Sequence, residues 1–116
     1  MDRLRDVRLF AVGGVGITGS PNRGETITRE LAHRRDAIEA FAWLAEHGEP
    51  AAQLYAYWAL RTLAPARAAT YAPVLAKVST VVETMTGCLA WAERVSSLAA
   101  RMANPDDVVG QPMPAP

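Results

Sequence analysis

The sequence has a single cysteine, Cys88, and a single lysine, Lys77, among its 116 residues. One cysteine excludes an internal disulfide and a cysteine-based zinc site. No apolar run reaches the length of about 20 residues that crosses a bilayer, because Gln53 and Arg61 interrupt the best candidate. Net charge is also absent, since twelve basic side chains balance twelve acidic ones. No net field therefore attracts the chain to phosphates or to an anionic membrane, and we expect neither nucleic acid nor a membrane as a partner.

The N-terminus admits two interpretations of the compartment. Three arginines precede the apolar stretch from Leu9 to Ile17, as in a secretion signal. Asp2 and Asp6 cancel much of that positive charge, however, and no A-x-A cleavage site follows. We therefore expect a cytoplasmic protein, with export as the alternative.

Half of the residues are hydrophobic and 21% are charged, which is the balance of a globular domain. The composition changes twice along the chain. Residues 1–24 are rich in glycine and predict an irregular arm, whereas residues 25–103 contain mostly helix-forming residues and predict the folded helical domain. Residues 104–116 are rich in proline and predict a disordered tail.

Capping and helix-breaking residues divide the helical domain. Asp36 is a good N-cap and Gly48 a good C-cap for one helix, and Pro50 and Pro65 suit the start and the end of the next. The second of these helices is apolar around most of its circumference and should be the central element. Thr26 or Thr28 caps a first short predicted helix that ends near His33, the second runs from Asp36 to Gly48, and the third begins at Pro50 and runs until Pro65 stops it. Two short pieces within 67–77, separated by Pro73, and a last helix from about Cys88 to Met102 follow.

The last helix carries the clearest periodic pattern, with a predicted core stripe of Trp91, Val95, Leu98 and Met102. Before it, the β-branched residues from Val78 onward favour an extended segment. The sequence therefore predicts an all-α fold, a compact bundle of four or five helices with the Gly-rich arm at its N-terminus. The one short two-stranded contact that it admits joins Val7–Val12 to Thr80–Met85.

The block from Glu49 to Leu63, EPAAQLYAYWALRTL, resembles a helix of a HEAT or armadillo repeat, in which proline, small residues and leucines recur at such spacings. The resemblance covers about one helical pair, and no second copy is evident at the repeat period. It implies HEAT-like helix pairing and a scaffold that binds proteins. The glycines of Gly13–Gly16, with Gly24 and Gly87-Cys88, are also similar to those of small bacterial proteins, which implies no particular activity.

Trp43 is the most informative residue for function. The helical wheel places it on the polar side of its helix, one turn from His47, although tryptophan is more common at interfaces than on free surface. Tyr57 and Arg61, on the polar stripe of the next helix, would extend the same patch. We therefore predict a non-catalytic adaptor, scaffold or inhibitor that binds another protein, or a second copy of itself, through Trp43, His47, Tyr57 and Arg61. In the alternative, the N-terminal arm covers Trp43.

Other motifs suggest chemistry less specifically. Cys88 follows a glycine at the predicted start of the last helix, where backbone amides would stabilise a thiolate, and this supports the alternative of a thiol enzyme or redox sensor. The G-x-G-x-x-G of Gly14–Gly19 lacks the helix that a dinucleotide needs, because Pro21 and Gly24 follow it. The E-x-x-H of Glu30 and His33 lacks the second copy that a di-metal site needs. We therefore expect no cofactor, no metal and no catalytic residue.

Overall fold

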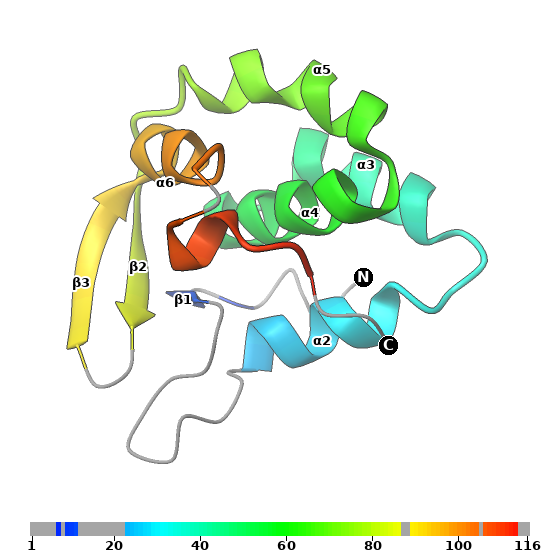
Figure 1. Ribbon diagram of the computed structural model, residues 1–116, viewed down its shortest axis with the longest axis horizontal. Coiled ribbons are helices and arrows are strands. Elements are labelled where there is room, and N and C mark those ends of the chain that lie inside the picture. Colours follow the sequence, from blue (N-terminus) through cyan, green and yellow to red (C-terminus); the bar gives the residue numbers. More distant parts are fainter. Residues whose placement is uncertain (1–6, 8, 12–22, 87–88, 105, 114–116) are drawn as a thin grey trace.

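The structure, a computed structural model, describes residues 7, 9–11, 23–86, 89–104 and 106–113. A layer of helices packs against one side of a small sheet (Figure 1). In chain order the elements are β1 (Leu9–Phe10), α2 (Arg23–Leu31), α3 (Ala37–His47), α4 (Pro50–Leu63), α5 (Pro65–Leu75), β2 (Val81–Thr86), β3 (Leu89–Arg94), α6 (Val95–Arg101) and the 3-10 helix η1 (Val108–Gly110).

Helix α4 is the central element, as its apolar circumference predicts. It contacts α2, α3, α5 and α6 as well as β1 and β2. Pro50 occupies its first turn, where a missing N–H costs no hydrogen bond, and Gly48 ends the preceding helix. The expectation of a polar stripe through Tyr57 is wrong, because neighbours on several sides leave this side chain only 8% exposed.

The all-α prediction is wrong, because β2 and β3 pair as antiparallel strands and β1 joins them in a three-stranded sheet of order β1-β2-β3. The β-branched segment that forms β2 disfavours a helix and needs hydrogen-bond partners for its N–H and C=O groups. Residues 89–94 supply these partners as a strand, so that Val82 lies opposite Glu93 and Thr84 opposite Trp91. The last helix consequently begins at Val95 and not at residue 88.

The predicted contact between the N-terminal segment and residues 80–85 is confirmed. Leu9 and Phe10 of β1 pair in parallel with Glu83 and Thr84 of β2. Tyr55 of α4 fixes this strand, since its Oη accepts a hydrogen bond from the Ala11 N–H at 2.9 Å and donates one to the Ala11 carbonyl at 3.1 Å. The core of the molecule therefore includes residues from the N-terminal segment.

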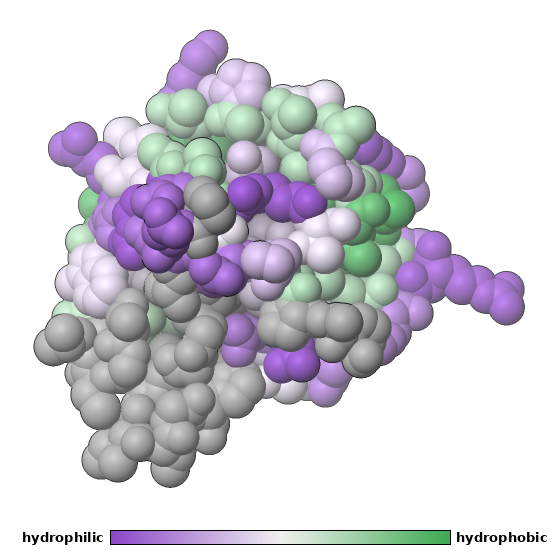
Figure 2. All heavy atoms as spheres, viewed as in Figure 1, coloured by the Kyte–Doolittle hydropathy of each residue, from purple (hydrophilic) through white to green (hydrophobic). Residues whose placement is uncertain are grey.

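Helix α5 continues through Pro73, although the sequence predicted two pieces separated there. Proline removes one N–H and interferes with the carbonyl four residues earlier, a cost that is greatest in a helix interior. Pro73 lies in the last turn of α5, so little of the helix follows it. Figure 2 shows weakly hydrophobic residues along the α5 side of the surface, which reflects the alanines of this helix.

The prediction that nothing in the C-terminal tail packs is also wrong. Val109 and Met113 are 3% and 6% exposed and belong to the core. The Trp58 indole N–H donates to the Gln111 carbonyl at 3.1 Å, and the Met113 N–H donates to Thr62 Oγ1 at 3.0 Å. Figure 1 shows the segment after η1 running across α4. The division of the chain at residues 24 and 103 stays a prediction.

Arg101 joins the hairpin, α6 and the tail. Its guanidinium donates to Glu93 Oε1 of β3 at 2.6 Å and to both carboxylate oxygens of Asp107 at 2.8 and 3.0 Å. The hydrogen bonds that Arg101 donates to Asp107 raise the pKa of Arg101, and the negative charges of Glu93 and Asp107 act in the same direction. The Trp91 indole N–H donates to the same Glu93 oxygen at 2.9 Å, and the Arg101 guanidinium lies 5.9 Å from the Trp91 ring centroid.

The predicted core stripe of the last helix is confirmed at Val95, Leu98 and Met102, which are fully buried. It is wrong at Trp91, which is 37% exposed. The predicted stripe required one helix through all four residues. Because Trp91 belongs to strand β3 and α6 begins only at Val95, the Trp91 side chain does not continue the buried face of the helix. Trp91 is therefore held at the protein surface by Glu93 and Arg101.

Candidate functional site

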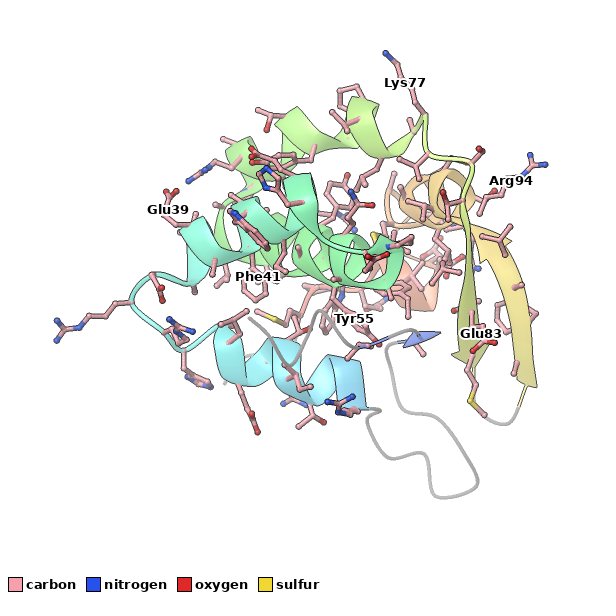
Figure 3. All side chains as sticks on the ribbon, turned by 180° about the vertical axis from the view of Figure 1, so that it is seen from behind. Glu39, Phe41, Tyr55, Lys77, Glu83 and Arg94 are labelled. Carbon is pink, nitrogen blue, oxygen red and sulfur yellow. The ribbon has the colours of Figure 1, made fainter. Side chains whose placement is uncertain are left out.

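Trp43 is the exposed side chain on which the candidate site is built. It lies near the middle of α3 and is 38% exposed, whereas Phe41 and Leu44 of the same helix are fully buried. The predicted position on the solvent side of the helix is therefore confirmed. Figure 3 shows α3 from the side on which Glu39, one turn before Trp43, projects outward.

His47 packs against Trp43. The two rings are four residues apart on α3, and their centroids are 5.0 Å apart at an interplanar angle of 31°. His47 Nδ1 lies 3.2 Å from the Trp43 carbonyl, which accepts its hydrogen bond. Since this contact fixes the imidazole, the two rings present one joined surface to solvent.

Two carboxylates on α3 lie beside the aromatic pair and bind side chains of α5. Glu39 forms an ion pair with Arg67, and Glu46 Oε1 accepts a hydrogen bond from Tyr71 Oη at 2.9 Å. Residues three, four and seven apart share one side of a helix, so Glu39, Trp43, Glu46 and His47 form a single stripe. We call this stripe, together with Arg67 and Tyr71, the Trp43 surface.

The electrostatics of this surface follow from the same contacts. The hydrogen bond to Glu39 raises the pKa of Arg67, and the negative charge of Glu39 acts in the same direction. Removal from water raises the pKa of Tyr71, and the hydrogen bond to Glu46 adds to that increase. Arg67 and Tyr71 therefore hold the two carboxylates of α3 in place at neutral pH.

The structure brings together only two of the four residues predicted for partner binding. Tyr57 is buried in α4 and is not available to a partner. Arg61 is half-buried in the last turns of α4, and no interaction among the described residues links it to Trp43 or His47. The predicted patch of four residues is thus reduced to Trp43 and His47.

Sequence reasoning missed Arg67 and Tyr71 because their partners, Glu39 and Glu46, are on another helix, and the pattern of one helix does not show which neighbour it packs against. A signal for them was present. Glu39 and Glu46 are seven residues apart on one side of α3, and Arg67 and Tyr71 are four apart on one side of α5. Matching an acidic stripe on one helix with donors on another would have identified the connection.

A second candidate is a hollow between α2, the end of α4 and the tail. Its volume is about 310 Å³, at the lower end of the range for small-molecule sites. Three of its polar side chains, including Glu30 of the E-x-x-H motif, come from α2, and His33 of the same motif lies in the turn after that helix. The lining residues are Thr26, Arg29, Glu30, Ala32, His33, Leu63 and Met113. The polar residues among its described lining are all at least partly solvated, so none of them is a buried polar group that could orient a ligand.

Several predicted features lie outside the described residues. These are Cys88, the glycine motif at residues 14–19 and most of the arm proposed to cover Trp43. In the part of the chain that the structure describes, no three or more His, Cys, Asp or Glu residues gather in a possible metal site. No described helix is both long enough and apolar enough to cross a membrane.

Comparison of the chain with protein-family models, curated proteins and solved structures found no match.

Proposed function

We propose that this chain is a protein-binding domain without catalytic activity, and that its partner contacts the Trp43 surface. The observation that carries the proposal is the exposed Trp43 with His47 packed against it. Tryptophan and arginine are among the residue types that contribute most to interface energetics, and the Trp43 surface presents Trp43 and Arg67 to solvent, while Tyr71 is buried.

The contacts within the surface favour binding in a second way. Ordering a flexible side chain at an interface costs about 0.5 to 1.5 kcal/mol. Here Glu39 is paired with Arg67, Glu46 with Tyr71, and His47 with the carbonyl of Trp43. These contacts already restrict the side chains in the free protein. Binding therefore costs less conformational entropy at these side chains.

The composition of the surface indicates the kind of partner it fits. Its centre is aromatic, and its carboxylates are already paired with Arg67 and Tyr71. A partner would therefore present an apolar side chain to Trp43 and hydrogen-bonding groups around it, as in the polar rim of a typical interface.

Site-specific photo-crosslinking tests this proposal. A photoreactive residue placed at His47, next to Trp43, should yield a covalent adduct with a specific protein in an extract of the source organism. The control carries the same residue at Lys77, which is exposed beyond the end of α5 (Figure 3). Equal adducts from both positions, or none from position 47, would contradict the proposal.

A further inference from the structure

Strand β3 is the outer strand of the sheet. It pairs with β2 on one side and packs against α6, and Figure 1 shows it at the periphery of the molecule. Every strand residue has an N–H and a C=O in the plane of the sheet, and these groups point alternately to the two sides of the strand. One set of β3 backbone groups is therefore directed away from β2.

The pairing register identifies this set. The Val95 N–H donates to the Thr80 carbonyl at 2.9 Å, and the register from Val81↔Arg94 onward continues that pairing. Hydrogen-bonded pairs alternate with non-hydrogen-bonded ones in an antiparallel ladder, so that Glu93 and Trp91 bond to β2. The N–H and C=O groups that point away from β2 consequently belong to Ala90, Ala92 and Arg94.

Among the described residues, this edge has little of the protection that outer strands usually carry. Proteins protect such edges with proline, charged side chains (above all lysine), bulges or a covering element, and of these β3 has the charged residues Glu93 and Arg94 at one end. The described strand β3, LAWAER, contains neither proline nor lysine, and its pairing with β2 has no bulge. Ala90 and Ala92 are exposed, and their small side chains leave the backbone accessible.

We propose that β3 pairs with β3 of a second copy of this chain and forms one continuous sheet. In an antiparallel arrangement with the two-fold axis at Ala92, each Ala92 faces the other and each Ala90 faces Arg94 of the other copy. Each such pair exchanges two backbone hydrogen bonds. Trp91 then lies opposite Glu93, so that no like charges are opposed, and the zero net charge of the chain adds no long-range repulsion between the copies.

The dimer contact is separate from the surface of the proposed function. Figure 3 shows Glu39, on the Trp43 surface, and Arg94, on β3, at opposite sides of the molecule. Pairing through β3 therefore leaves both copies of the Trp43 surface open. The two proposals can be tested independently, because they depend on different residues.

Sedimentation equilibrium of the full chain over micromolar to near-millimolar concentrations tests the dimer. Wild type should approach twice the monomer mass. Ala92→Pro removes an outward N–H without removing a bond to β2, and Ala92→Lys places two lysines opposite each other across the two-fold axis. Each should raise the dimer dissociation constant by at least about tenfold, which corresponds to about 1.4 kcal/mol. Ala69→Lys, at an exposed position on α5, is the matched control and should have no effect.

Amide hydrogen exchange locates the contact without any substitution. As concentration rises, exchange should slow at Ala90, Ala92 and Arg94, whereas Trp91 and Glu93 should be protected at all concentrations. A monomer mass throughout the range overturns the proposal. So does a dimer whose mass is unchanged in both Ala92 variants, or whose outward amides exchange freely.

Discussion

The rings of Trp43 and His47 lie 5.0 Å apart at the exposed surface of α3, with the imidazole held by the carbonyl of Trp43. An indole in this position contacts both protein and water.

Trp43 should be accessible to a soluble quencher. In a variant with Trp58→Phe and Trp91→Phe, Trp43 is the single tryptophan, and its 38% exposure predicts red-shifted fluorescence that acrylamide quenches efficiently. A variant that retains only Trp58, which is 2% exposed, serves as the comparison. If Trp43 were as protected as Trp58, the N-terminal arm would cover it in solution.

Deletion of the residues after Asp107 should destabilise the protein by at least about 2 kcal/mol, because it removes the buried side chains of Val109 and Met113. It also removes the acceptor of the Trp58 indole hydrogen bond. Chemical denaturation measures the loss, and removal of only the last three residues is the control. An unchanged midpoint after the longer deletion would show that the tail is not docked in solution.

The sequence could predict most of the helices but only part of the surface. Caps and prolines located α3 and α4 closely, because Gly48 and Pro50 act through local backbone geometry. Trp91 was misassigned because the pairing of β2 with β3 depends on contacts outside the strand itself. Met113 was missed for a similar reason, since composition indicates flexibility whereas its burial depends on contacts with α4, where its N–H bonds to Thr62. Tyr57 shows that a wheel drawn for one helix does not reveal which neighbours cover it.

Gly24→Ala should destabilise the protein although alanine is the better helix former. The new Cβ would come within 2.7 Å of Tyr55 Oη and closer to its ring carbons, and Tyr55 is held by two hydrogen bonds to Ala11. Overpacking costs about 1 to 3 kcal/mol, which exceeds the gain of up to about 1 kcal/mol in helix propensity. Thermal melting compares this variant with Arg23→Ala, an exposed change in the same turn. A higher melting temperature than wild type would mean that Tyr55 moves aside easily.

The contact between Tyr71 and Glu46 should make stability depend on alkaline pH. The pKa of Tyr71 is raised in the folded state above its ordinary value of 10.0. Its contribution to stability is therefore complete below about pH 10 and is lost as the pH rises through the folded-state pKa. Urea denaturation should show the advantage of wild type over Tyr71→Phe shrinking above about pH 10. A constant difference between the two proteins would contradict the raised pKa.

The most direct test of the account is the affinity of Trp43→Ala for the protein that crosslinks to position 47. Isothermal titration should show binding weakened by about 2 kcal/mol or more, while the stability of the variant falls by only about 1 kcal/mol. Trp91→Ala is the matched control, because Trp91 has nearly the same exposure, 37% against 38%, on the distant hairpin. The account predicts that Trp91→Ala binds like wild type. Equal affinity of Trp43→Ala and wild type would contradict the assignment of the Trp43 surface as the binding site.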